Sequence, residues 1–382
     1  MHAQTLPEPS APLARLTRRL GAAVPWASAT PGPVGLDLGQ DALHLVQVER
    51  GRAGVRLRAA ASVEYEGGLD ALLAAPRELR RVVARGLARG RFRGRRVVTC
   101  MPTHRTRLLL LGYRVEPDQD DGAAVLAAAA ERLQGSIDEW VVDYVPVGAA
   151  DPETPERTAL LVAARRVDVI ELLDRLAAGG LTVAALEVGP VAIRRLISAS
   201  VDGDTHTTTL VVNIGRARSY LTVVSGRRLI LDREVGLGAD AVVEQVASTL
   251  ELPVRSAEAV LARFGVDARA ASEAGPGGEP EVIEALGEIV TESLAPLFAE
   301  VDRVRLYTAA HTRGAPVDRA LLHGAAARWP GCSGLLERRL DLPVAPLDPF
   351  AIIPGAPPAS AGGPSATALA VAAGCALWVP EG

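Results

Sequence analysis

The feature that most constrains the fold of this sequence is an internal repeat. Residues 34–63 and residues 209–234 each contain three short apolar strands separated by turns that contain glycine. A helical pattern follows each unit, at residues 72–87 and 239–250. Two such units in 382 residues predict a duplicated α/β fold with two lobes. A ligand site is then expected between the lobes, near the turns that end the two first strands.

Charge and cysteine content exclude several classes of function. The chain carries 41 basic and 45 acidic residues, a net charge of -4, which gives no overall positive field to attract nucleic acid. All the basic residues are Arg, which excludes Schiff-base chemistry and a Lys on a phosphate. Cys100, Cys332 and Cys375 are isolated, which argues against a disulfide framework or a zinc site and favours a reducing, cytoplasmic compartment.

Alternating helices and strands between the two repeat units predict a small α/β subdomain. Helices are expected at residues 118–133 and 166–178, and strands at residues 140–147, 159–164 and 182–186. Beyond the second unit, the pattern predicts a long helix at 281–302 and a strand at 319–322.

The two ends of the chain leave one question open. Residues 12–20 place Leu and Arg at helical spacing, which fits either a basic amphipathic helix on a membrane surface or a solvated tail. Residues 366–379 are apolar but shorter than the roughly 20 residues that span a bilayer, so they predict a core helix.

Several segments, in their order along the chain, resemble the PilM family of type IV pilus assembly proteins. These segments are residues 34–39 (VGLDLG), 45–48 (LVQV), 137–144 (IDEWVVDY), 160–166 (LLVAARR), 180–187 with Pro190, 232–234 (DRE) with Gly236 and Gly238, and 374–377 (GCAL). The PilM family is grouped with the division protein FtsA, the Hsp70 ATPase domain and sugar kinases. The resemblance therefore implies a two-lobed actin-like α/β fold of the Hsp70/FtsA type, with an inserted small α/β subdomain.

The resemblance also implies how the chain is divided. The parts are a tail expected to be disordered (1–32), a first lobe (33–105, with a return at 189–206), an inserted subdomain (106–188), a second lobe (207–350), a Pro/Gly linker (351–365) and a C-terminal helix on the first lobe (366–382).

Actin-like proteins hold a nucleotide between two β-turns, and the resemblance places that site on this sequence. The implied residues are Asp37, Gly39, Gln40 and Asp41 in the first turn, Asn213, Gly215 and Arg216 in the second, and Gly324 and Ala325 at the adenosine. Asp37 stands at the first acidic position and is the expected Mg²⁺ ligand. The alternative is that Asp37 only caps the turn. Arg216 and Arg218 either reach the phosphates or lie in solvent.

Departures from the family pattern predict that this site has degenerated. Gln40 and Asp41 stand where relatives carry Ser or Thr, and Asn213 stands where they carry Asp. The adenosine turn keeps only Gly324 of the usual two or three glycines. Each lost charge-assisted contact costs about 1.5–3 kcal/mol, so we expect ATP with Mg²⁺ to bind weakly or not at all. No catalytic residue is predicted, and the interpretation of this chain as an enzyme is the less favoured one.

The resemblance implies a cytoplasmic scaffold of type IV pilus assembly, or of a related secretion machine. Such a scaffold docks the N-terminal peptide of a PilN-like inner-membrane protein, contacts other pilus components and lies at the inner membrane through these partners. This requires an apolar groove, expected between the inserted subdomain and the first lobe. The alternatives are an actin-like ATPase or kinase, and an FtsA-like division protein. The second is disfavoured because no amphipathic tether follows the closing helix.

Overall fold

The computed structural model describes residues 29–52, 54–116, 119–147, 156–200, 206–267, 280–312, 314–355 and 366–380. The possible amphipathic helix at residues 12–20 and most of the expected tail and linker lie outside these ranges. Strand β1 begins at Thr30, inside the segment expected to be a tail.

The first lobe is built on a five-stranded sheet with the order β3-β2-β1-β4-β8. Its strands are β1 (Thr30–Leu38), β2 (Ala42–Gly51), β3 (Gly54–Glu64), β4 (Arg96–Cys100) and β8 (Thr182–Glu187). The first three strands form an antiparallel meander, and β4 and β8 continue the sheet in parallel from β1.

The second lobe repeats this arrangement strand for strand, with the order β11-β10-β9-β12-β13. Its strands are β9 (Thr208–Ile214), β10 (Ser219–Ser225), β11 (Arg228–Val235), β12 (Arg319–Gly324) and β13 (Val344–Pro346). Again a meander is continued by two parallel strands, so the duplication expected from the sequence is confirmed.

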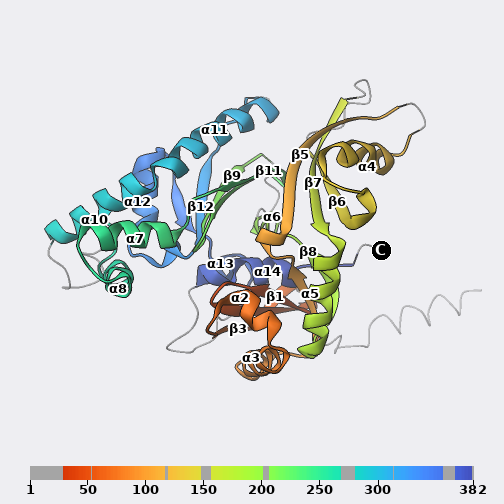
Figure 1. The fold of residues 1–382 in the computed structure, drawn as a ribbon, viewed down its shortest axis with the longest axis horizontal. Helices are drawn as coiled ribbons and strands as arrows, with labels where there is room; N and C mark the ends of the chain where they lie inside the picture. Colours follow the sequence, from red (N-terminus) through yellow and green to blue (C-terminus); the bar gives the residue numbers. More distant parts are fainter. Residues whose placement is uncertain are drawn as a thin grey trace, which may run out of the picture.

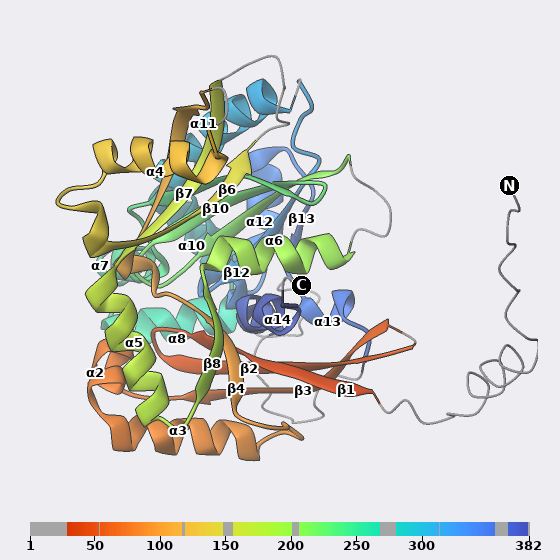
Figure 2. The same cartoon turned by 90° about the vertical axis from the view of Figure 1, so that its right-hand side faces the viewer.

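Helices cover both sheets and fill the space between them (Figures 1 and 2). On the first lobe, α2 (Gly68–Ala74), α3 (Pro76–Ala88) and α5 (Arg166–Ala178) share one apolar core with the sheet. The outer helices of the second lobe are α7 (Ala239–Thr249), α8 (Val254–Phe264), α10 (Pro280–Ser293), α11 (Ala295–His311) and α12 (Cys332–Leu340).

Between the sheets lie α6 (Gly189–Ser200) and α14 (Ala370–Ala376), with the short α13 (Pro349–Ile352) beside them (Figure 2). Their core includes side chains of both sheets, among them Val46 of β2 and Val211 of β9. The apolar segment after residue 366 therefore packs as the expected core helix, begun by a 3₁₀ turn at Ala366–Leu369.

The inserted subdomain is smaller than expected. Its antiparallel sheet contains β5 (Thr106–Arg114), β7 (Glu156–Arg165) and β6 (Trp140–Val147), with α4 (Asp121–Arg132) on one face. The next two elements, α5 and β8, belong to the first lobe, because β8 pairs with β4 and α5 packs on the first core. The boundary expected at residue 188 is therefore wrong, and the subdomain ends at the close of β7.

Two expected helices are each divided in the structure. The helix expected at 72–87 is α2 followed by α3, because Pro76 lacks an N–H and starts a new helix. The helix expected at 281–302 is α10 followed by α11, which begins just before Pro296. Helices α6, α8 and α12 were not expected. Within the described ranges, no helix is both long enough and apolar enough to cross a membrane.

Candidate functional site

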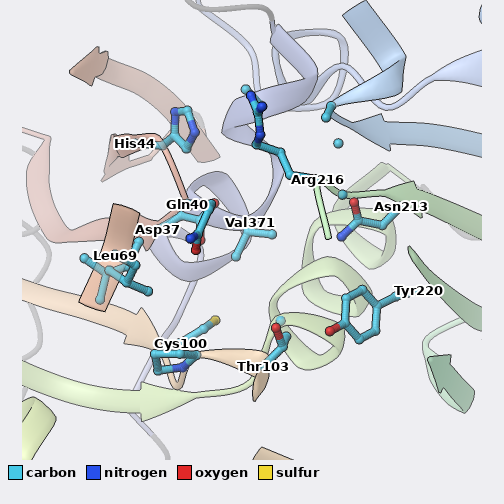
Figure 3. A pocket seen from close by; sticks show the side chains of 18 of the residues that line it. Asp37, Gln40, His44, Leu69, Cys100, Thr103, Asn213, Arg216, Tyr220 and Val371 are labelled. Carbon is cyan, nitrogen blue, oxygen red and sulfur yellow. The ribbon is translucent and has the colours of Figure 1, made fainter. Parts of the chain in front are cut away.

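A cavity of about 1090 Å³ lies between the two lobes (Figure 3). All the residues that the resemblance implied for a nucleotide site line this cavity: Asp37, Gly39, Gln40, Asp41, Asn213, Gly215, Arg216, Gly324 and Ala325. They come from the β1–β2 turn, the β9–β10 turn and the end of β12. The fold thus brings together residues that are almost 290 positions apart in the sequence.

The two turns that face the cavity have matching geometry. A side chain at Gly39 would place Cβ 2.7 Å from the carbonyl oxygen of Ala42, and one at Gly215 would place it 2.7 Å from that of Arg218. Gly324 has φ +93°, and its Cβ would lie 2.3 Å from Oδ1 of Asn213. Each position therefore requires glycine, and the turns are symmetric in backbone shape but not in side-chain chemistry.

Asp37 lies at the end of β1, where the chain turns into the cavity. Burial raises the pKa of Asp37 to about 7, so the carboxyl is about half ionised at neutral pH. A protonated carboxyl is a poor Mg²⁺ ligand. In the part of the chain that the structure describes, no group of three or more His, Cys, Asp or Glu side chains is arranged to hold a metal ion.

Arg216 reaches across the cavity from the second lobe to the first. Its guanidinium lies 3.5 Å from Oδ2 of Asp41, 3.0 Å from Oδ1 of Asp240 and 3.3 Å from Oε1 of Glu258. Arg328, also of the second lobe, lies 3.9 Å from the same Asp41 oxygen. Arg216 is therefore occupied by carboxylates of the protein itself, which is neither of the two placements that the sequence left open.

The sequence did not reveal Asp232, a second half-buried carboxyl in the cavity wall. Burial raises its pKa to about 7, and Oδ1 accepts a hydrogen bond of 2.5 Å from the Thr222 hydroxyl. The local sequence carries no signal for it, because Asp232 opens a run of three charged residues with Arg233 and Glu234. Nearby, Thr103 and Tyr220 point toward one another from opposite lobes (Figure 3).

Two histidines, the half-buried His44 and the buried His323, also line the cavity and were not predicted as site residues. Burial lowers the pKa of His44 and of His323 to about 4, so both are neutral at physiological pH. The Nδ1 atom of His44 lies 2.9 Å from the Ser62 hydroxyl. The histidines therefore add no positive charge to the cavity.

An apolar groove of about 590 Å³ lies on the inserted subdomain. Its lining comes from α4, β6 and the turn between them, with Arg166 of α5: Leu126, Ala127, Ala130, Ile137, Asp138, Trp140, Val141, Val142 and Arg166. Strand β6 is at the edge of its sheet, so one side of its backbone has no neighbouring strand in that sheet. We call this surface the β6 groove. Of its lining residues only Arg166 belongs to an element of the first lobe, so the groove lies on the subdomain rather than between the subdomain and the first lobe, where an apolar groove was expected.

Comparisons with known proteins show a family and similar solved structures. The family model described as type IV pilus assembly protein PilM matches residues 35–379. A solved structure titled PilM-PilN type IV pilus biogenesis complex is similar with a TM-score of 0.72 and 24% identity, covering 91% of this chain and 98% of that chain.

Two further solved structures are more distant. The ethanolamine utilization protein EutJ from Carboxydothermus hydrogenoformans gives a TM-score of 0.48 at 15% identity, covering 91% of this chain and 89% of that one. MreB5 of Spiroplasma citri bound to ADP gives 0.48 at 10% identity, covering 90% and 94%. The two-lobed actin-like fold that the resemblance implied is confirmed by the duplicated sheets and by the similarity to the PilM-PilN complex structure.

Proposed function

Because this chain belongs to the PilM family of type IV pilus assembly proteins, we propose that it acts as a non-catalytic scaffold that docks a PilN-like partner. The docked segment is the N-terminal peptide of that inner-membrane protein. Binding would hold the scaffold on the cytoplasmic side of the inner membrane, beside other components of the pilus machinery.

The observation that carries this proposal is the β6 groove and the apolar surface around it. Leu126 of α4 is 47% exposed and Val141 of β6 is 39% exposed. The apolar surface continues onto α5, where Val167 and Ile170 are more than half exposed. An extended peptide can add its backbone to the free edge of a strand while its apolar side chains cover such residues.

The interlobe cavity supports the non-catalytic part of the proposal, because its charges do not fit a triphosphate. Asp41, Asp240 and Glu258 surround Arg216, and Asp37 adds a partly ionised carboxyl at the first turn. A triphosphate entering between the turns would meet these carboxylates and an Arg already paired with them. We therefore propose that nucleotide binding is weak or lost, and that neither ATPase nor kinase activity remains.

Calorimetric titration with the N-terminal peptide of the PilN-like protein from the same organism tests the docking. Val141→Asp and Leu126→Asp each put a charge where an apolar side chain of the peptide would lie. Since burying such a side chain contributes about 1.5–3 kcal/mol, each variant should bind at least about tenfold more weakly.

The matched control is Leu306→Asp, because Leu306 is 74% exposed on α11 of the second lobe, away from the groove. Its affinity for the peptide should equal that of the unaltered protein. No binding by the folded unaltered protein contradicts the docking, and unchanged binding by both groove variants contradicts this location.

A further inference from the structure

One short segment of this acidic protein is strongly basic. Residues 77–96 contain nine Arg and one Glu, a net charge of +8, which leaves -12 for the rest of a chain whose total is -4. The nine are Arg77, Arg80, Arg81, Arg85, Arg89, Arg91, Arg93, Arg95 and Arg96. We call the surface that they form the basic face.

The fold concentrates these residues on one outer side of the first lobe. Helix α3 is fixed by Leu79, Val82, Val83 and Gly86, which are buried. All nine Arg residues are exposed, six of them on α3 or the turn that follows it, where the helix lies along the lower edge of the molecule in Figure 2. The positive charge therefore lies on a surface that points away from the interlobe cavity, except at Arg85 and Arg89, which reach its rim.

Most of this charge is not neutralised within the protein. Arg80, Arg85, Arg89 and Arg95 donate to backbone carbonyl oxygens, which are uncharged acceptors. Arg81 pairs with Glu78. The guanidinium groups of Arg77, Arg91, Arg93 and Arg96 have no hydrogen bond or ion pair within the described part of the chain.

We propose that the basic face binds the anionic phospholipid headgroups of a membrane surface. Guanidinium groups form paired hydrogen bonds with phosphate oxygens, and a cluster of four to eight basic residues on an amphipathic helix is typical of such surfaces. The strongly negative remainder of the protein is repelled by the same lipids, so adsorption also orients the molecule with α3 toward the membrane.

Membrane adsorption fits this face better than nucleic-acid binding. A single-strand site needs exposed aromatic side chains for base stacking, whereas Phe92, the one aromatic residue in the segment, is half-buried. Binding to anionic lipid headgroups requires only the positive charge that the basic face presents, without aromatic stacking.

The basic face and the β6 groove lie at the two ends of α5. Arg166, which lines the groove, begins the helix, and the carbonyl of Ala178 at its other end accepts hydrogen bonds from Arg80 (Figure 1). A helix of 13 residues is about 20 Å long, a distance that about six extended residues of a peptide can span. A partner peptide bound in the β6 groove could therefore reach a membrane that lies against the basic face. This connection rests on the proposed function, whereas the inference about the basic face does not.

Co-sedimentation of the full chain alone with lipid vesicles tests the inference without any partner peptide. The protein should bind vesicles that contain phosphatidylglycerol and not vesicles of phosphatidylcholine alone. Binding should fall as salt rises above about 0.1 M, where the Debye length is about 10 Å. The combined variant Arg77→Gln, Arg91→Gln, Arg93→Gln and Arg96→Gln removes no intramolecular bond and should bind at least about 100-fold more weakly, given about fivefold per Arg.

The matched control removes four exposed Arg residues elsewhere and changes the net charge equally. It combines Arg132→Gln, Arg227→Gln, Arg228→Gln and Arg255→Gln, and should keep nearly all of the vesicle binding. No binding of the unaltered chain to anionic vesicles overturns the inference, as does an equal loss in the control. Duplex DNA that binds more tightly than the vesicles, through the same four Arg residues of the basic face, would show instead that this face is a nucleic-acid site.

Discussion

The two half-buried carboxyls, Asp37 and Asp232, make the stability of this protein depend on pH in an unusual direction. Burial raises each pKa from 3.8 to about 7. The folded protein therefore holds these protons more tightly than the unfolded chain does. Their contribution to the free energy of unfolding is fully present below pH 3.8 and is lost as the pH rises to about 7.

Replacing Asp37 by Asn removes one of these ionisations. At about pH 3.5, below the unfolded-state pKa of 3.8, Asp37 is mostly protonated in both the folded and the unfolded chain, so Asp37→Asn should have nearly the stability of the unaltered protein. At pH 8 the variant should be more stable by about 1–2 kcal/mol, since water in the cavity screens part of the burial cost. Urea unfolding at the two pH values measures this difference. Asp302→Asn, at an exposed position on α11, is the control, and an equal gain there would refute the explanation.

At the level of single elements, α14 packs unusually close to β1. A side chain at Gly35 would place Cβ 1.9 Å from the carbonyl oxygen of Ala372 and 2.5 Å from the amide nitrogen of Ala376. Both atoms are backbone, so the helix itself must move. On the other side of α14, a Cβ at Gly374 would lie 2.1 Å from the carbonyl oxygen of Ala192 in α6. The glycines therefore set the spacing of the central layer.

The substitution Gly35→Ala should lower the free energy of unfolding by about 3 kcal/mol or more, because overpacking against backbone leaves no side chain to rotate away. Chemical denaturation measures this loss. Gly112→Ala on β5 is the matched control, since nothing lies within 4 Å of its Cβ position. That variant should stay within about 0.5 kcal/mol of the unaltered protein. If both variants are equally stable, the close packing of α14 is not as described.

Patterns among neighbouring residues predicted the strands and helices that such residues alone define. The two meanders and helix α5 (Arg166–Ala178) lie where they were expected, because Gly turns and apolar periodicity mark them. The pattern did not show that α5 and β8 belong to the first lobe rather than to the inserted subdomain. The pairing of β8 with β4 joins residues more than 80 positions apart, which no local pattern reveals. Helix α6 was not found as a helix, although its apolar face is strong.

The candidate site could be predicted in position but not in its contacts. The resemblance placed nine residues, and all of them line one cavity. No pattern could show that Arg216 pairs with Asp41, Asp240 and Glu258, because these carboxylates come from separate elements of both lobes. Whether the cavity accepts a nucleotide stays a prediction.

For the whole molecule, the arrangement of charge between the lobes predicts the response to nucleotide. Addition of ATP with Mg²⁺ should leave the thermal unfolding temperature unchanged. A ligand at 100 times its dissociation constant would add about 2.7 kcal/mol, which is easily detected. A shift of that size at millimolar ATP would refute the proposed loss of binding.

The position of α14 also bears on how the protein is made. Strand β1 is translated more than 330 residues before α14, yet the two are in direct contact in the finished fold. The sheet of the first lobe emerges from the ribosome with the face under α14 uncovered. This lobe therefore completes its core only near the end of synthesis, and until then its apolar surface depends on chaperones or on α6 for protection from aggregation.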